Sequence, residues 1–161
     1  MIRFNRILAC VDLSEYSRKT MEYAVALSRA MMTDMIVLNV INIREIEAIN
    51  RAANHYSGQG QISVDDYVEQ TKADRLKRVY ELINNYCSPD GNKITTIVEV
   101  GVPFKTILEI IERKKIDVVV QGNKGRTNAV GALFGSHAEK VFRHSPVPVF
   151  SVRSIMGNQK R

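Results

Sequence analysis

Three glycines and a serine in the second half of the chain have a spacing that suits a phosphate group. These residues are Gly122, Gly125, Gly135 and Ser136. Because glycine has no Cβ, a backbone that contains it can turn sharply and come close to a ligand, and the unpaired N–H groups at a helix start favour an anion. Lys124 and Arg126 add positive charge in the same segment. The pattern therefore favours phosphate binding between a strand and a helix.

Each of these residues also has a purely structural explanation. Gly122 could only end a strand, and the sequence from Ser136 to Glu139 has the S-x-x-E form of a capping box, with Ser136 as the cap. The chain contains neither the P-loop pattern GxxxxGK[ST] nor a GxGxxG after its first apolar run. The residues alone leave phosphate binding and a structural role equally open.

Short apolar runs alternate with helical patterns along the chain. The five expected strands cover residues 6–11, 35–41, 94–100, 117–121 and 147–152, and the expected helices cover about 16–32 and 65–86, follow Pro103, and begin at Ser136. This alternation predicts an α/β fold with a parallel sheet and helices on both faces. Ligands of such sheets bind beyond the carboxyl ends of the strands. We therefore expect chemistry at Asp12, Ile41 and Gly122.

The middle of the chain, residues 42–92, is less regular. Residues 54–63 hold Gly58 and Gly60 among small polar residues, and this composition predicts a mobile loop. Since no second core pattern follows the loop, we expect residues 1–161 to form a single domain.

Composition excludes several classes of protein. With 45% hydrophobic and 25% charged residues, the chain is typical of globular domains and unlike disordered or collagen-like sequences. The longest early apolar run, residues 7–11, is too short for a signal-peptide core or a membrane span. Cys10 and Cys87 form no CxxC pattern, so nothing points to an oxidising compartment. The expectation is a soluble cytoplasmic domain.

The net positive charge of the chain arises in its last third. Residues 111–161 hold 10 of the 23 basic side chains but only 3 of the 17 acidic ones. A basic surface could bind nucleic acid, an anionic membrane or a phosphate ligand, or could only be solvated. Aromatic residues make up 7% of the chain and Trp is absent, which disfavours nucleic-acid binding by base stacking.

The glycine residues together with four apolar runs resemble a known family. The spacing Gly122-x2-Gly125-x9-Gly135-Ser136 is similar to the nucleotide motif G-x2-G-x9-G-[S/T] of the universal stress protein family. The runs ILACVD from Ile7, VLNV from Val37, VVVQG from Val118 and SPVPV from Ser145 resemble strands of that family. The resemblance covers residues 3–153 except for the middle segment. It implies a three-layer Rossmann-like fold, of the adenine nucleotide alpha hydrolase-like kind, with a five-stranded parallel sheet of order 3-2-1-4-5.

The resemblance also implies a site for ATP with Mg²⁺ or Mn²⁺. The implied nucleotide-binding residues are Asp12, Val40, Gly122, Lys124, Gly125, Arg126, Gly135, Ser136 and His137. Asp12 would face ribose hydroxyls or a metal-bound water, and Val40 would contact adenine; from the residues alone, Asp12 could be a helix cap and Val40 an ordinary core valine. Many family members have His at the position of Asn39, a departure that we expect to affect packing more than ligand binding.

Three functions remain open at this point. The implied function is that of an ATP-binding regulatory or stress-response protein. A slow ATPase using the same cleft is an alternative, although only Gln121 offers a group to position water. The third is a binding module for AMP or another adenylate. Three scattered His and two Cys make no metal site at a recognised spacing.

A homodimer is expected at the fifth strand, from Val147 to Val152. In a sheet of order 3-2-1-4-5 this strand lies at the edge, and an uncharged apolar edge invites pairing. Two copies could pair these edges antiparallel and bury Val149 and Phe150. The family resemblance implies the same arrangement.

Overall fold

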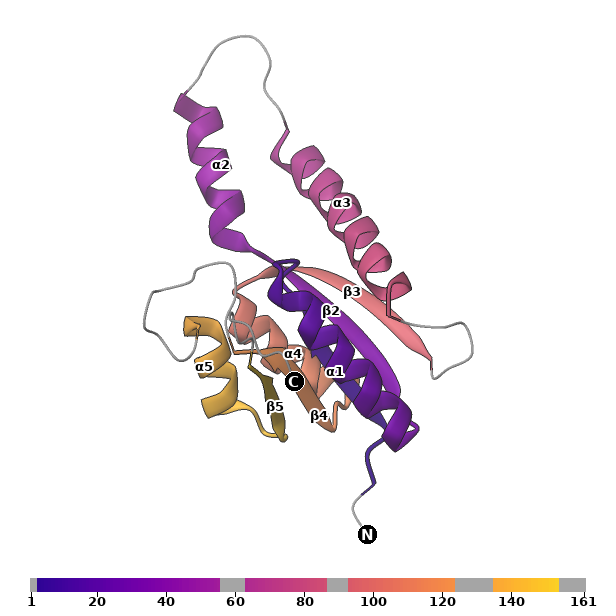
Figure 1. Ribbon diagram of the computed structural model, residues 1–161. Helices are drawn as coiled ribbons and strands as arrows, with labels where there is room; N and C mark the ends of the chain where they lie inside the picture. Colours follow the sequence, from indigo (N-terminus) through magenta and orange to yellow (C-terminus); the bar gives the residue numbers. More distant parts are fainter. Residues whose placement is uncertain (1–2, 56–62, 87–92, 124–134, 154–161) are drawn as a thin grey trace.

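The computed structural model describes residues 3–55, 63–86, 93–123 and 135–153, and the side chains of all of these except 53–55. A five-stranded sheet of order β3-β2-β1-β4-β5 lies at the centre, and all four strand pairs are parallel (Figure 1). The strands are β1 (Arg6–Cys10), β2 (Asp34–Asn42), β3 (Ile94–Gly101), β4 (Val118–Gly122) and β5 (Val149–Val152). The helices are α1 (Tyr16–Met31), α2 (Ile43–His55), α3 (Val64–Asn84), α4 (Pro103–Lys114) and α5 (Ser136–His144). The predicted α/β fold and strand order are confirmed.

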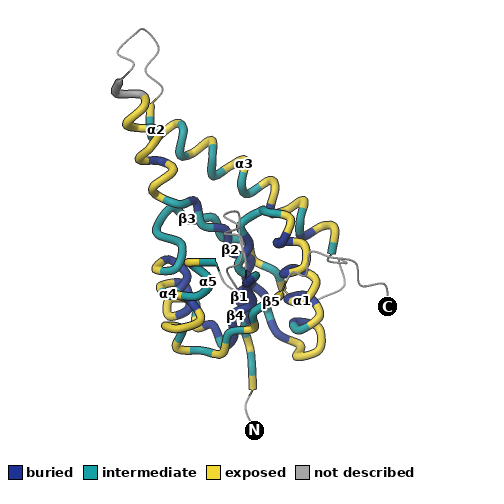
Figure 2. Tube along the Cα trace, turned by 60° about the vertical axis from the view of Figure 1, so that its left-hand side comes forward, coloured by how far each residue is buried: buried dark blue, intermediate teal, exposed yellow. Residues whose placement is uncertain are grey.

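Two apolar layers hold the helices to the sheet. Because successive side chains of a strand point to opposite faces, Ile7 and Ala9 of β1 pack with α1 and α3, whereas Leu8 packs with α4 and α5. In Figure 2 the buried residues follow the sheet and the inner faces of these helices. The central strands β1 and β4 are therefore apolar on both faces, as the short continuous runs in the sequence predicted.

Local sequence sets where the helices begin and end. Ser63 caps α3 by accepting a hydrogen bond from the N–H of Asp66 at 3.4 Å. Pro103 starts α4, where its missing N–H costs nothing. Before it, a Cβ on Gly101 would lie 2.3 Å from the Thr106 hydroxyl oxygen, so any other residue there would force the Thr106 side chain to move.

Helix α2 was missed by the sequence interpretation. Ile43, Ile46 and Ile49 recur at a helical spacing that the interpretation did not use, and of residues 43–52 only Ile46 is buried. The Asn42 side chain helps to start the helix by accepting from the N–H of Arg44 at 3.1 Å. The predicted loop 54–63 is thus wrong at its first two residues, which belong to α2, while residues 56–62 lie outside the described part.

Strand β5 is shorter than predicted at its beginning. Ser145 forms hydrogen bonds with both the N–H and the C=O of Val147, and Pro148 has no N–H to donate. Val147 therefore lies in a bend, the Pro148 carbonyl accepts from the N–H of Val119 at 3.0 Å, and the strand begins at Val149.

Helices α2 and α3 extend together beyond the carboxyl edge of the sheet (Figures 1 and 2). The first turn of α2 follows directly from β2. No helix among the described residues is long and apolar enough to cross a membrane.

Candidate functional site

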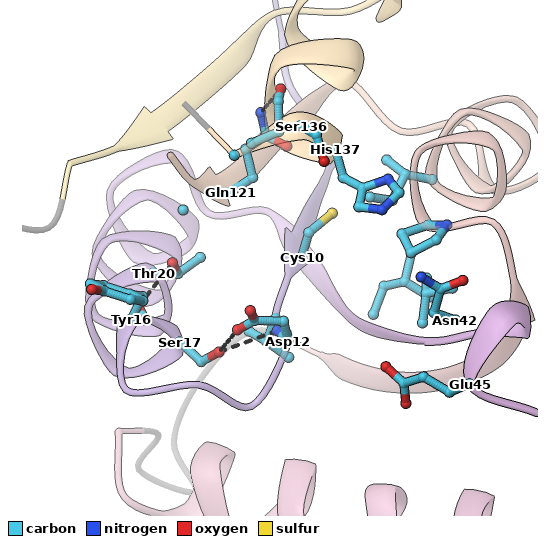
Figure 3. Close-up of a pocket in the computed structure, with 18 residues that line it drawn as sticks. Cys10, Asp12, Tyr16, Ser17, Thr20, Asn42, Glu45, Gln121, Ser136 and His137 are labelled. Atoms are coloured by element: carbon cyan, nitrogen blue, oxygen red, sulfur yellow. Dashed lines mark hydrogen bonds between the residues drawn. The ribbon is translucent and has the colours of Figure 1, made fainter. Parts of the chain in front are cut away.

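A cavity of about 380 Å³ lies at the carboxyl edge of the sheet, where β1, β2 and β4 end. This volume falls within the roughly 300–1,000 Å³ of typical small-molecule sites. Its lining residues are Cys10, Val11, Asp12, Tyr16, Ser17, Thr20, Leu38, Val40, Asn42, Glu45, Pro103, Ile107, Gln121, Gly122, Gly135, Ser136, His137 and Ala138. Figure 3 shows Asp12 and Glu45 on one side and the start of α5 on the other. The cavity therefore occupies the place that the strand pattern predicted for a ligand.

Asp12 is held by the loop that leads from β1 into α1. Its Oδ1 accepts hydrogen bonds from Ser14 Oγ at 2.6 Å, Ser14 N–H at 3.0 Å and Ser17 Oγ at 2.9 Å. The residue between them, Leu13, has a φ of 61°, a left-handed conformation that is strained for a branched side chain. Asp12 is not the N-cap of α1, because Glu15 occupies that position. The carboxylate is thus fixed in orientation at the cavity wall.

Val40 brings a backbone donor and acceptor to the cavity. Strand β1 pairs with β2 only as far as Leu38, whose carbonyl accepts from the N–H of Val11 at 2.9 Å. Backbone groups alternate in direction along a strand, so Val40, two residues later, directs its N–H and C=O to the same side as Leu38. Since β1 has already ended there, both groups point toward the cavity.

Asn39, in contrast, lies away from the cavity. It is fully buried, and its Nδ2 donates to the carbonyl of Val11 at 2.8 Å. It is not among the lining residues. The expectation that this position affects packing is consistent with this placement.

The far wall is formed by the end of β4 and the start of α5. Gln121 donates from Nε2 to the carbonyl of Ala138 at 2.9 Å, which fastens α5 to β4. Its amide is therefore engaged in structure and does not support the suggested role in positioning water. The N–H of Gly135 donates to the carbonyl of Asn123 at 2.7 Å, which brings the two ends of the glycine segment together.

The predicted capping box at the start of α5 is wrong. Gly135 is the N-cap, in an extended conformation and without a side-chain cap, and Ser136 is the first helical residue. Glu139 pairs with Arg143 at 2.9 Å, four residues later, and so does not reach back to the helix start. The start of α5 therefore presents backbone N–H groups beside the cavity without a capping side chain.

His137 lies partly buried in the same wall. Its ring stacks on the ring of Phe104, with the two centroids 6.5 Å apart. The Lys140 Nζ lies over the Phe104 ring, 5.0 Å from its centroid. Burial lowers the pKa of His137 below its ordinary value, and the positive charges of Lys140 and Arg44 lower it further. Its Nδ1 is buried without a hydrogen-bond partner among the described residues. The imidazole is therefore neutral at pH 7 and faces a region of positive charge.

Cys10 lies on the cavity floor, where the sequence interpretation expected only a small apolar residue. Burial raises the pKa of its thiol to about 12. A thiol with such a pKa stays protonated and is a poor nucleophile at neutral pH. Cys10 therefore shapes the cavity as an apolar group, in agreement with that expectation.

Six of the nine candidate residues line this one cavity. They are Asp12, Val40, Gly122, Gly135, Ser136 and His137. Lys124, Gly125 and Arg126 lie outside the described residues. Within the described part of the chain, no three His, Cys, Asp or Glu side chains gather as a metal site.

The sequence interpretation missed several lining residues, notably Tyr16, Thr20 and Glu45. Tyr16 and Thr20 carry no distinctive spacing, since they belong to the ordinary buried stripe of α1. A signal for Glu45 exists: Asn42-x-x-Glu45 directly after a strand has the form of a helix start. Recognising it would have placed an acidic side chain beside the end of β2.

A protein-family model matches nearly the whole chain. The family model described as the universal stress protein family matches residues 3–153. The chain belongs to the universal stress protein family.

A curated member supports the assignment over nearly the whole chain. The universal stress protein MJ0577 of Methanocaldococcus jannaschii is 28% identical over 156 residues, which cover 94% of this chain and 96% of MJ0577. The universal stress protein YxiE of Bacillus subtilis is 25% identical over 155 residues, covering 93% and 99% of the two chains.

Solved structures share the fold. A structure of MJ0577 superimposes with a TM-score of 0.75 at 24% identity and covers 97% of this chain and all of that one. A universal stress protein in complex with cAMP has a TM-score of 0.58 at 22% identity, covering 94% and 98%. The universal stress protein of Archaeoglobus fulgidus in complex with dAMP has a TM-score of 0.54 at 16% identity, covering 94% and 98%.

Proposed function

We propose that this universal stress protein binds ATP in the cavity at the carboxyl edge of its sheet and acts as a nucleotide-dependent regulator. Two opposite walls of the cavity differ in the chemical groups that they present to a ligand. Val40 presents backbone groups on one side, and the glycine residues and the start of α5 lie on the other. A base and a phosphate chain need these two environments.

The end of the cavity near Val40 suits adenine. The Watson–Crick edge of adenine offers an acceptor at N1 and a donor at the 6-amino group, which matches the N–H and C=O of a single residue such as Val40. The surrounding side chains Leu38, Pro103 and Ile107 are apolar and suit the faces of a purine ring.

The opposite end suits phosphates. A helix N-terminus carries a partial positive charge and N–H groups that bind anions, and Gly122 and Gly135 leave room for backbone to approach. Lys140 and Arg44 act electrostatically on His137 in this wall, so positive charge is already present there. Lys124, Gly125 and Arg126 complete the proposed phosphate site from the sequence motif.

A Mg²⁺ or Mn²⁺ ion would arrive with the nucleotide. Mg²⁺ is commonly bound through substrate phosphates with only one or two protein carboxylates. Asp12, which lines the cavity in a fixed orientation, is a suitable carboxylate. The residues therefore fit a metal carried by ATP, whose chemistry would be to neutralise phosphate charge.

Two structural relatives support an adenine nucleotide as the ligand, since they are described as complexes with cAMP and dAMP. Binding of AMP or another adenylate, or slow ATP hydrolysis, would use the same cavity. Nucleic acid is not part of the proposal. The proposal includes a cytoplasmic location, on the ground that Cys10 and Cys87 form no paired motif.

The proposed function is tested by nucleotide binding to the purified protein. Mass spectrometry identifies any retained nucleotide, and calorimetry measures the affinity for ATP with Mg²⁺. Gly125→Val should weaken ATP binding at least tenfold, because a hydrogen bond to a charged group is worth about 1.5–3 kcal/mol. Gly131→Val, at a glycine in the nine-residue spacer of the motif and not at one of its fixed positions, is the matched control and should retain affinity.

Unchanged ATP affinity in a folded Gly125→Val protein would contradict the proposed phosphate site. Multiple-turnover release of phosphate would favour the ATPase alternative. Tighter binding of AMP than of ATP would favour the adenylate-binding module.

We further propose that two copies form a homodimer through β5. The strand lies at the edge of the sheet, so one side of its backbone is not paired by β4. Phe150 is 40% exposed and lies 5.7 Å from the ring of Tyr23, which is 42% exposed. The edge therefore combines open backbone groups with exposed aromatic surface.

A further inference from the structure

Glu45 follows Val40 by five residues, just beyond the end of β2, and its carboxylate lines the same cavity. It belongs to the first turn of α2, three residues after Asn42, and both line the cavity. Figure 3 shows its carboxylate turned from α2 toward the cavity, facing the side where Asp12 lies. Glu45 is not part of the glycine motif, which runs from Gly122 to Ser136.

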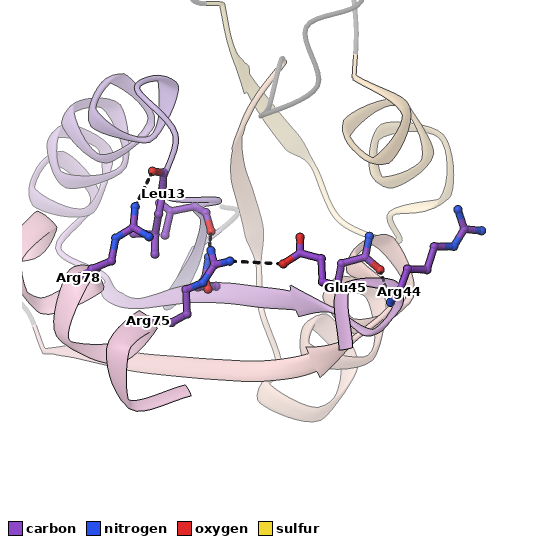
Figure 4. Close-up of polar contacts among 8 residues, drawn as sticks. Leu13, Arg44, Glu45, Arg75 and Arg78 are labelled. Atoms are coloured by element: carbon purple, nitrogen blue, oxygen red, sulfur yellow. Dashed lines mark hydrogen bonds and ion pairs between the residues drawn. The ribbon is translucent and has the colours of Figure 1, made fainter. Parts of the chain in front are cut away.

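Arg75 of α3 forms an ion pair with Glu45. Arg75 Nη2 lies 3.5 Å from Glu45 Oε2, and the Arg75 side chain is only 11% exposed (Figure 4). Three residues further along the same helix, Arg78 donates to the carbonyl of Leu13 at 3.3 Å. Helix α3 thus holds both the loop that carries Asp12 and the helix that carries Glu45.

A carboxylate can accept hydrogen bonds but not donate them. In the cavity wall, the Glu45 carboxylate attracts a ligand group that carries an N–H or O–H and repels a group that has only oxygen acceptors. It also repels phosphate, which favours an orientation with the phosphates at the start of α5 and the base beside β2.

The Val40 backbone and Glu45 together suit an amino group. A 6-amino group carries two hydrogens, of which the Val40 carbonyl can accept one. Glu45, on the same side of the cavity, is suited to accept the other. A 6-oxo purine has no hydrogen at that position and brings an oxygen toward the carboxylate.

We propose that Glu45, positioned by Arg75, selects purine nucleotides with a 6-amino group over those with a 6-oxo group. This inference rests on the proposed nucleotide site and adds to it a specificity-determining side chain and a positioning residue. Neither residue belongs to the motif from which the site was first inferred.

The test compares ATP with inosine 5′-triphosphate, which has the same ribose and phosphates but a 6-oxo group and a hydrogen on N1. Calorimetry gives the ratio of the two affinities for each protein. In Glu45→Gln the amide can donate to the 6-oxo oxygen, so the preference for ATP should fall about tenfold or more, as expected for a hydrogen bond to a charged group. Glu47→Gln, on the exposed surface of the same helix, should leave the ratio unchanged.

Arg75 is tested by the same ratio, which a purely structural role would not move. Arg75→Gln should lower the preference for ATP in the same direction as Glu45→Gln, and Arg75→Lys should restore part of it. Circular dichroism confirms that each variant is folded before its affinities are compared.

Two results would overturn the inference, and they are distinguishable. If the unmodified protein binds neither nucleotide, the proposed function fails and the inference fails with it. If the unmodified protein prefers ATP and folded Glu45→Gln keeps the same ratio, the site stands but Glu45 does not select the base.

Discussion

His137 shows how one wall of the cavity sets the charge of a single residue. The ring is stacked on Phe104 and faces the positive charges of Arg44 and Lys140. Burial and these charges lower its pKa, so it is neutral at pH 7 in the folded protein. In the unfolded chain its pKa returns to about 6.5.

This difference predicts a stability change with pH. Between the lowered folded pKa and about pH 6.5, the unfolded chain binds more protons, so His137 makes the free energy of unfolding fall as pH decreases through that window. In His137→Gln this contribution is absent. Denaturant unfolding at pH 7.5 and pH 5.0 should show a smaller loss of stability on acidification for His137→Gln than for the unmodified protein; equal losses would contradict the assigned environment.

Individual site residues differed in how well the sequence could identify them. Asp12 and Gly122 were found because strand ends can be recognised from short apolar runs, and parallel strands bring those ends together. At the end of β2 the run pointed to Ile41, which is buried and does not line the cavity, and only the family resemblance implied Val40. Glu45 was missed because α2, the helix that carries it, was not recognised in the irregular middle segment of the sequence. Glu45 also contacts Arg75, which is thirty residues away in sequence, and no local sequence pattern predicts that contact.

At the scale of elements, two helices end on residues in a left-handed conformation. Met32 follows α1 with a φ of 52°, and Lys115 follows α4 with a φ of 50°. Glycine is the usual residue there, because a Cβ costs roughly 1–2 kcal/mol in this conformation. Met32 is also 85% exposed, so its side chain contributes little packing.

Met32→Gly should therefore stabilise the protein by about 0.5–1 kcal/mol, since relief of backbone strain exceeds the entropic cost of glycine. The change is measured as the free energy of unfolding in urea. Ala26→Gly, at an exposed position within α1, is the matched control and should destabilise by about 1 kcal/mol. A loss of stability in both variants would show that the end of α1 carries no such strain.

The limits of β1 to β4 differ from the predicted ones by one residue at each end at most. The apolar runs of β1, β2 and β4 fit strands that are buried on both faces, whereas β3 lies at an edge of the sheet and is only half-buried. The predicted β5 began two residues early, since the Ser145 turn that occupies Val147 depends on side-chain hydrogen bonds rather than on hydropathy.

At the scale of the whole molecule, the two edges of the sheet are covered differently. Strand β3 lies at one edge, on the side of the sheet along which α3 packs, whereas β5 is a four-residue strand at the other (Figure 1). Among the large apolar side chains exposed on the described surface, Phe150 and Tyr23 are the two that meet at this second edge. A twofold axis beside β5 would bring both copies of this pair together and continue the sheet across the dimer.

The proposed homodimer predicts a mass of twice 18.2 kDa by sedimentation equilibrium at tens of micromolar. Val149→Lys combined with Phe150→Glu should convert it to the monomer, because charged side chains would have to be desolvated in the apolar contact and the aromatic surface would be lost. Tyr80→Glu replaces a more exposed aromatic on α3, away from this edge, and should leave the mass unchanged. The competing arrangement, in which the polar tail of residues 154–161 covers β5, concerns residues outside the described part. It predicts a monomer of 18.2 kDa before any substitution, and a monomeric unmodified protein would therefore exclude pairing through β5.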